Sequence, residues 1–405
     1  MGNKASTDAA EEESTPSQSS PQRAPSYYQQ AKDGYDSLVD AIIRPPRADY
    51  DLAELGPPEF TIRGRRFARK DFDLVNKLGL TIRASHWEPV VRGAPTLPCV
   101  VYLHGNSSCR AEAIEYVETV LSLGVTLMAI DFAGCGMSEG QYISLGWFEQ
   151  DDVATVMEYL RSTGTVSTVG LWGRSMGAAT ALMFGHRDLS IAAMVLDSPF
   201  SSLPVLCREL SSKIDIPIPG FLVSGALSMI RSSIKSRANF DIYKVVPSEH
   251  VETCFIPAIF TAANDDDFIL PSHTEQIHEK YAGDKNLIMV PGNHNTSRPR
   301  FLQDSVAIFL FSRLCQPVGM TNDSLSNSLL ASAHLGDGMN DGGRSKDDGG
   351  GGEGAHDGFG EGEVDIRSLE DWACTSCTFI NDYTQTMCSM CQEHRGHLFA
   401  DTEGH

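Results

Sequence analysis

Residues 169–177 read Val-Gly-Leu-Trp-Gly-Arg-Ser-Met-Gly, and this stretch indicates both a fold and a chemistry. Val169–Trp172 is a short apolar run typical of a buried strand. Gly173 to Gly177 then has the pattern G-x-S-x-G, and a helix-compatible run, Ala178–Phe184, follows. In this context the glycines flank a serine on a sharp, strained turn, where larger neighbours would clash. The stretch predicts that Ser175 is a nucleophile at the end of a strand.

Similar apolar runs lie on both sides of this turn, and helical stretches such as Ala111–Leu123 and Asp151–Leu160 separate most of them. A strand-like antiparallel pattern from Phe60 to about Val91 comes before them. This order predicts an α/β-hydrolase fold, a mostly parallel sheet flanked by helices. Residues 201–246 interrupt the alternation, and we expect them to form a helical cap over the active site. The predicted buried strands are Cys99–Leu103, Thr126–Ile130, Val169–Trp172, Ala193–Leu196, Ala258–Thr261 and Leu287–Val290.

Two later turns are expected to complete a catalytic triad, because the order in this fold is serine, acid, histidine. His294 follows the last predicted strand and would take the proton from Ser175. Asp265, Asp266 and Asp267 follow the strand before it and compete for the acid role, and Asp197 is an outside candidate.

The turn His104-Gly105-Asn106 follows the strand Cys99–Leu103. In this fold that turn and the residue after the nucleophile supply the backbone N–H groups of the oxyanion hole. We therefore assign the hole to the amides of Asn106 and Met176. The side chain of His104 is interpreted as structural.

Residues from about Tyr35 to Cys315 resemble the serine-aminopeptidase-like branch of the α/β-hydrolases, and are most similar to a eukaryotic group. This resemblance implies hydrolysis of an ester, thioester or amide through an acyl-enzyme, and neighbouring depalmitoylases and monoacylglycerol lipases favour an acyl ester or acyl thioester. It also selects Asp266 as the acid, since related sequences place an aspartate at that point of the turn. The motifs are Arg44-Pro45-Pro46-Arg47, His104-Gly105-Asn106-Ser107, Leu171–Gly177, Leu196–Phe200, Asp265–Phe268 and Asp131–Ser138, where Asp131 is structural.

Four of the ten cysteines form two C-x-x-C pairs near the C-terminus: Cys374, Cys377, Cys388 and Cys391. Four thiolates at this spacing predict one tetrahedral Zn²⁺, which would replace the hydrophobic core that so short a segment lacks. The spacing resembles a Ran-binding-protein-type zinc finger. Thr378, Phe379 and Met390 match positions that mark its ubiquitin-binding subfamily, which implies ubiquitin as the partner. RNA is disfavoured because the flanks are acidic, and a purely structural finger stays open.

The distribution of charge and of residue types along the chain predicts how it divides into domains and linkers. The 405 residues carry a net charge of −21, and residues 316–405, with 16 acidic and 4 basic residues, hold −12 of it. Such a tail repels nucleic acid and acts as a solvated linker. We expect residues 1–30 to be disordered, 31–316 to form the hydrolase, 317–368 an acidic Gly-rich linker, 369–395 the finger and 396–405 a tail. An amphipathic helix from Tyr35 to Ile42 is expected to end at Pro45-Pro46.

The N-terminus fits the myristoylation signal M-G-x-x-x-[ST], with Gly2 as the acceptor. One myristoyl chain gives marginal membrane binding, and the basic set Arg63, Arg65, Arg66, Arg69 and Lys70 could add a second attraction or could simply face solvent. No apolar signal region is recognised. The expected location is the cytoplasm, peripherally associated with membranes.

The sequence thus predicts a serine hydrolase tethered to a ubiquitin-recognising finger, with no cofactor needed for catalysis. Two alternatives stay open. One is a catalytically silent hydrolase-fold adaptor that recruits ubiquitinated partners. The other is peptide or isopeptide cleavage by Ser175.

Overall fold

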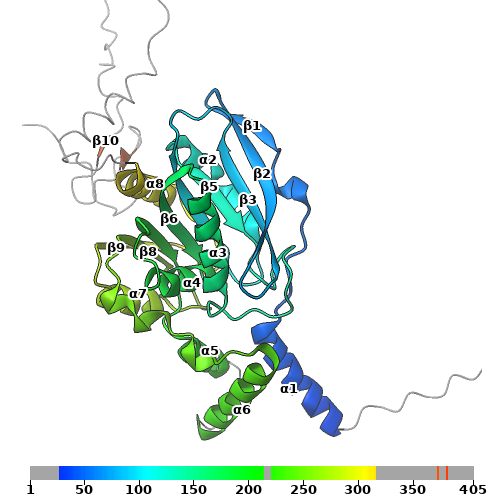
Figure 1. Cartoon of the computed structure of the whole chain (residues 1–405). Coiled ribbons are helices and arrows are strands. Elements are labelled where there is room, and N and C mark those ends of the chain that lie inside the picture. Colours follow the sequence, from blue (N-terminus) through cyan, green and yellow to red (C-terminus); the bar gives the residue numbers. More distant parts are fainter. Residues whose placement is uncertain (1–26, 214–219, 316–371, 374–379, 382–405) are drawn as a thin grey trace, which may run out of the picture. The chain divides into compact units, whose positions relative to one another are not determined.

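The computed structural model describes residues 27–213, 220–315, 372–373 and 380–381. The chain divides into two compact units, Met1–Ser328 and Leu329–His405. In the second unit the described strands β10 (Trp372–Ala373) and β11 (Ile380–Asn381) pair antiparallel. The first unit contains the sheet and helices of Figure 1. Its helices are α1 (Tyr27–Ile43), α2 (Ile114–Ser122), α3 (Glu149–Ser162), α4 (Met176–Gly185), α5 (Leu203–Ser212), α6 (Gly220–Ala238), α7 (Pro271–Lys280) and α8 (Arg300–Leu314).

The nine strands of the first unit form one sheet in the order β1-β2-β3-β5-β4-β6-β7-β8-β9. β1, β2, β3 and β5 pair antiparallel in succession, and every pairing from β5 to β9 is parallel. The strand bounds are β1 Glu59–Ile62, β2 Arg65–Val75, β3 Thr81–Pro89, β4 Leu97–Leu103, β5 Thr126–Ile130, β6 Val166–Arg174, β7 Ala193–Asp197, β8 Ala258–Ala263 and β9 Lys285–Val290. Short 3₁₀ turns are η1 Leu52–Leu55, η2 Arg110–Ala113, η3 Ile242–Lys244, η4 Pro247–Glu249 and η5 Val251–Thr253.

Both faces of the sheet are buried, as β4 demonstrates. Cys99, Val101 and Leu103 belong to one hydrophobic cluster, while Val100 and Tyr102 between them belong to another. This alternation follows from the two-residue period of a strand. The first cluster includes side chains of α3 and α4, and the second includes those of α2 and α8. A parallel sheet with helices on both faces is therefore present, and the predicted fold class is confirmed for this unit.

Each predicted buried strand occurs. Thr126–Ile130 has the bounds of β5, and the other strands differ from the prediction by one to three residues at one or both ends. The predicted helix Ala111–Leu123 is a 3₁₀ turn, η2, followed by α2. α1 begins at Tyr27, inside the segment predicted to be disordered, because the expected boundary rested only on apolar spacing that starts at Tyr35. It ends at Ile43, just before the two prolines.

α5 and α6 lie between β7 and β8 in the chain, and α6 packs beside α1 at one end of the unit (Figure 1). The Tyr35 hydroxyl lies 2.7 Å from Oγ of Ser233, and Arg237 forms ion pairs with Asp36 and Asp40. The N-terminal helix is thereby fixed to the insertion between β7 and β8.

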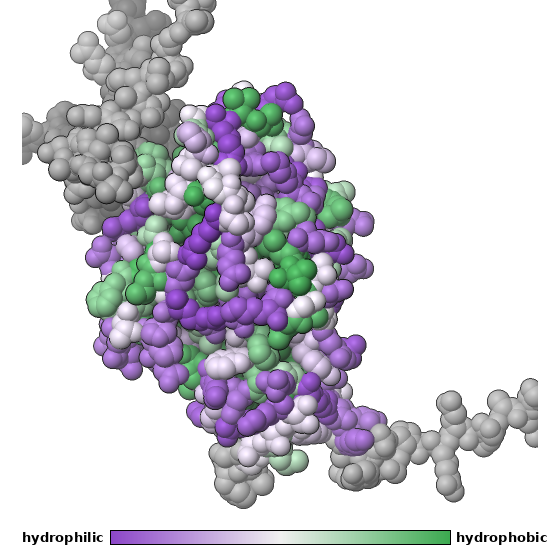
Figure 2. Space-filling model, viewed as in Figure 1, coloured by the Kyte–Doolittle hydropathy of each residue, from purple (hydrophilic) through white to green (hydrophobic). Residues whose placement is uncertain are grey.

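On the face in Figure 2, hydrophobic residues occur in small groups separated by hydrophilic ones. Among the described helices, none combines the length and apolar character needed to cross a bilayer. Three of the five basic residues proposed as a second membrane attraction are paired: Arg66 with Glu59, Arg69 with Asp71 and Lys70 with Glu88.

Candidate active site

Ser175 stands between β6 and α4 with φ 53° and ψ −116°, a conformation that L-residues rarely adopt. The glycines on either side permit this turn. A Cβ on Gly177 would lie 1.9 Å from the carbonyl oxygen of Leu103, and one on Gly173 would lie 2.4 Å from the carbonyl of Gly177. The Ser175 amide donates to the carbonyl oxygen of Asp197 at 2.7 Å, which fixes the turn to β7.

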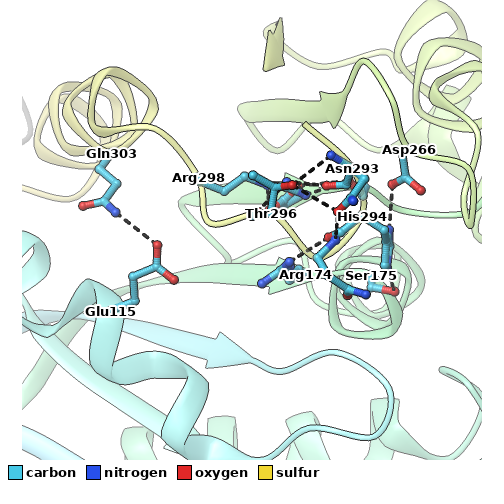
Figure 3. A network of polar contacts seen from close by, with 12 residues as sticks. Glu115, Arg174, Ser175, Asp266, Asn293, His294, Thr296, Arg298 and Gln303 are labelled. Carbon is cyan, nitrogen blue, oxygen red and sulfur yellow. Dashed lines mark hydrogen bonds and ion pairs between the residues drawn. The ribbon is translucent and has the colours of Figure 1, made fainter. Parts of the chain in front are cut away.

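Ser175, His294 and Asp266 lie together in one hydrogen-bonded chain (Figure 3). His294 Nε2 is 3.1 Å from Ser175 Oγ, and His294 Nδ1 is 2.6 Å from Asp266 Oδ2. The other carboxylate oxygen, Oδ1, accepts the amides of Phe268 at 3.0 Å and Ile269 at 2.8 Å. These two donors hold the carboxylate of Asp266 in place, and its contact with Nδ1 orients the imidazole so that Nε2 faces Ser175 Oγ.

The competing aspartates have other positions. Asp265 and Asp267 are exposed, whereas Asp266 is 3% exposed. Asp197 is buried but forms a two-point ion pair with Arg298, at 2.7 and 2.9 Å. Among the four acids considered from the sequence, only Asp266 contacts the imidazole of His294 within the described residues.

Asn106 and Met176, the residues assigned to the oxyanion hole, line the same cavity as Ser175. Within the described residues neither amide donates a hydrogen bond, so both are available for a ligand oxygen. His104 supports this turn: its Nδ1 donates to the carbonyl of Gly105 at 2.7 Å, and its Nε2 accepts the amide of Phe132 at 3.1 Å. Its role in the structure is therefore positional, as the sequence indicated.

Arg174 links three parts of the site, a role that the sequence did not reveal. Its Nη2 donates to the carbonyl oxygen of His294 at 2.7 Å, and its Nη1 lies 3.6 Å from Glu112 Oε1. Glu112 Oε2 accepts the amide of Gly105 at 3.1 Å. The variable position before the serine thus connects the nucleophile turn, the histidine loop and the oxyanion turn. The G-x-S-x-G pattern leaves this position free, so no sequence signal marked it.

Arg298 braces the loop that carries His294 from the other side (Figure 3). Besides Asp197, its guanidinium donates to the carbonyls of Asn293 at 3.3 Å and Thr296 at 3.0 Å. The side chains of both Arg298 and Asp197 are almost wholly buried. This pair was missed because its partners lie 101 residues apart and belong to no local motif.

Two cavities of different character meet at Ser175, and Asn106, Ser175 and Phe268 line both. The larger has a volume of about 700 Å³ and polar walls, which include Glu112 and Arg174. The smaller has a volume of about 100 Å³. Its other lining residues are Ala41, Ile42, Leu145, Met176, Phe200, Leu203, Leu206, Cys207, Leu210 and Ile269, all apolar apart from the thiol of Cys207.

Comparisons with known proteins bear on the fold of this unit. Residues 94–285 match the model of a hydrolase family described as serine aminopeptidase, S33. The matched segment is thus similar to the serine-aminopeptidase-like α/β-hydrolases. The chain is similar to the protein YqkD of Bacillus subtilis (strain 168), at 27% identity over 232 residues, which are 56% of this chain and 73% of YqkD. A segment of 132 residues is 30% identical to human protein ABHD12B and covers 31% of this chain and 36% of that protein.

Solved structures agree on the fold. The Pyrococcus furiosus esterase Pf2001 matches with a TM-score of 0.50 and 20% identity, over 67% of this chain and 99% of the esterase. The acetyl xylan esterase of a Paenibacillus species also matches with a TM-score of 0.50, at 16% identity, over 70% of this chain and 94% of its own. At these identities the likeness establishes the α/β-hydrolase fold alone.

Several predicted sites lie outside the described residues. These are Gly2, the four zinc-ligand candidates Cys374, Cys377, Cys388 and Cys391, and the ubiquitin-contact candidates Thr378, Phe379 and Met390. The described residues hold six free cysteines, and they contain no group of three or more side chains arranged to bind a metal ion.

Proposed function

We propose that this protein is a serine hydrolase that cleaves an acyl ester or acyl thioester, of a lipid or an S-acylated protein, through an acyl-enzyme. The observation that carries this proposal is the hydrogen-bonded chain from Asp266 through His294 to Ser175. Asn106 and Met176 support it, because both line a cavity with Ser175 and neither amide donates a hydrogen bond within the described residues.

The chemistry follows from the positions of these groups. Ser175 Oγ attacks the acyl carbon while His294 Nε2 takes its proton, and the carbonyl oxygen gains a negative charge next to the amides of Asn106 and Met176. Collapse of this intermediate breaks the bond to the leaving group, which receives the proton from His294. Water, deprotonated by His294, then attacks the acyl carbon. The bond to Ser175 Oγ breaks, Oγ regains the proton from His294, and the acid is released. Asp266 stabilises the imidazolium at both stages.

The two cavities suggest how a substrate lies across the site. An acyl group fits the apolar cavity, because burying its carbon surface is favourable. A leaving group with hydrogen-bonding atoms fits the polar cavity, which Glu112, Arg174 and Asn293 line. An alcohol, a sugar or a peptide segment bearing an acylated side chain meets this description.

A fluorophosphonate probe tests the proposal, because it phosphonylates activated serines. Purified full-length protein should be labelled, and Ser175→Ala should not. An Asp265→Asn variant is the matched control, since Asp265 is an exposed neighbour of the acid and should not alter labelling. Absence of labelling in a folded parent protein would favour the alternative, a catalytically silent adaptor for ubiquitinated partners.

For the C-terminal unit, we propose a structural Zn²⁺ held by Cys374, Cys377, Cys388 and Cys391, and ubiquitin binding by Thr378, Phe379 and Met390. Support comes from the cysteine spacing and from the β10–β11 pair, which brackets the first C-x-x-C in the chain. Elemental analysis should find one zinc per chain, lost in Cys388→Ser. A Thr378→Ala/Phe379→Ala variant should keep the zinc and lose ubiquitin binding in a pull-down. If the zinc-loaded parent protein does not bind ubiquitin, the proposal that ubiquitin is its partner is wrong.

We propose that the N-terminus is myristoylated at Gly2 and that the protein associates weakly with membranes on the cytoplasmic side. The first six residues support this, and the acid partners of Arg66, Arg69 and Lys70 weaken the case for a basic second attraction. Gly2→Ala should move the protein into the soluble fraction of a cell lysate. An unchanged distribution would count against lipidation.

A further inference from the structure

The small apolar cavity at Ser175 is lined in part by the N-terminal helix and by the helix that follows β7. Ala41 and Ile42 of α1 form part of its wall, and Leu206, Cys207 and Leu210 of α5 form another part. α1 lies before the segment that matches the hydrolase family, residues 94–285. This part of the wall is therefore supplied by a segment outside the family match.

α1 is held firmly enough to act as a wall. The neighbours of Ile42 on the buried side, Val39 and Ile43, are fully inaccessible to solvent. The amide of Ile143 donates to the carbonyl oxygen of Ile43 at 2.8 Å, which ties the end of the helix to the loop after β5. Contacts of the same helix with Ser233 and Arg237 of α6 hold its other side.

The volume of the cavity limits what it accepts. An apolar cavity of about 150 Å³ in a protein core accommodates one benzene molecule, which has six carbons. By proportion, the space of about 100 Å³ beside Ser175 accommodates roughly four acyl carbons. Further acyl carbons would either lie outside this space, without the gain from burial, or displace closely packed side chains such as Leu203 and Phe200, each 2% exposed.

We infer that the site selects short acyl groups, of about acetyl to butyryl size, and that Ile42 of α1 sets this limit together with α5. The inference rests on the proposed hydrolase function and narrows its substrate class. Ile42 determines specificity through steric exclusion and takes no part in the bond-making steps. The leaving group is unrestricted by this wall, because it occupies the separate polar cavity.

The test is a chain-length profile of kcat/KM with p-nitrophenyl acetate, butyrate, hexanoate, octanoate and palmitate. The full-length protein should prefer the acetyl or butyryl ester, with kcat/KM lower by about tenfold or more for octanoate. Ile42→Ala removes three side-chain carbons and should move the optimum to hexanoate or longer. Ile42→Trp should narrow the profile toward acetate. The matched control is Ile308→Ala, which makes the same deletion at a 70% exposed position of α8 and should leave the profile unchanged.

Fluorophosphonate labelling of each variant separates the possible failures. A labelled parent that prefers octanoate or palmitate would overturn the inference and leave the hydrolase proposal intact. The inference would also be overturned, with the hydrolase proposal intact, if each Ile42 variant changed kcat/KM for every ester by the same factor. A parent that is neither labelled nor active on any ester would overturn the proposed function, and the chain-length limit would fall with it.

Discussion

Replacing Arg298 with methionine would remove the guanidinium that holds the histidine loop to the sheet. Arg298 donates to both carboxylate oxygens of Asp197 and to the carbonyls of Asn293 and Thr296. The side chains of Arg298 and Asp197 are only 2% and 4% exposed. Methionine preserves much of the length of the arginine side chain and supplies no charge.

The magnitude follows from what the substitution leaves behind. Breaking a buried ion pair from one side typically destabilises a protein by about 3–5 kcal/mol, because the remaining charge is buried without its partner. In Arg298→Met the Asp197 carboxylate would keep one side-chain donor, the Ser198 hydroxyl at 3.1 Å. We therefore expect a loss of about 3–5 kcal/mol of unfolding free energy. Adding Asp197→Asn should recover more than half of it, since the stranded charge is then gone.

Urea unfolding followed by tryptophan fluorescence measures these differences. Arg313→Met is the matched control: it breaks an ion pair with Asp284 in which the side chains are 40% and 75% exposed, and should cost less than about 1 kcal/mol. The reasoning fails if Arg298→Met unfolds within about 1 kcal/mol of the parent protein, or if the double variant is no more stable than the single one.

Two further predictions concern ionisable groups. Asp266→Asn should lower kcat by about four orders of magnitude, because the imidazole of His294 loses the partner that fixes its tautomer, while urea stability stays close to that of the Asp265→Asn control. Burial lowers the pKa of His86 to about 4, against about 6.5 when unfolded. The stability due to neutral His86 is fully present above pH 6.5 and is lost as the pH falls through 4. Over that window it amounts to about 3 kcal/mol, at roughly 1.4 kcal/mol per pH unit. His86→Gln should show a correspondingly smaller loss of unfolding free energy in acid, and an identical pH profile would contradict the assignment.

The success of the sequence at the nucleophile turn has a local physical reason. Gly173 and Gly177 are required by clashes within a few residues of Ser175, so the pattern carries its own structural context. The buried strands could also be predicted from the sequence. A strand that is buried on both faces, such as β4, forms a continuous apolar run. Choosing among three consecutive aspartates was harder, and needed a family resemblance until burial and the contact with His294 separated Asp266 from its neighbours.

The supporting contacts were beyond the sequence. Arg174 reaches His294 across 120 residues, and Arg298 reaches Asp197 across 101. Polar residues of this kind leave no periodic trace, and their partners are decided by the order of strands in the sheet. The apolar cavity could not be predicted from the sequence for the same reason. α1 and α5 lie far apart in the chain, and their residues line one cavity only in the folded protein.

The backbone conformation of Ser175 lowers the stability of the folded protein. A non-glycine residue at φ 53° and ψ −116° carries strain of about 1–3 kcal/mol, which glycine would relieve. A domain retained purely as a scaffold would therefore gain thermal stability by exchanging this serine for glycine. Ser175→Gly should raise the melting temperature while abolishing fluorophosphonate labelling. A loss of unfolding free energy larger than the roughly 0.5–1 kcal/mol that glycine costs through chain entropy would contradict the strain. The silent-adaptor alternative thus has to account for a residue that destabilises the fold and is useful only for its hydroxyl.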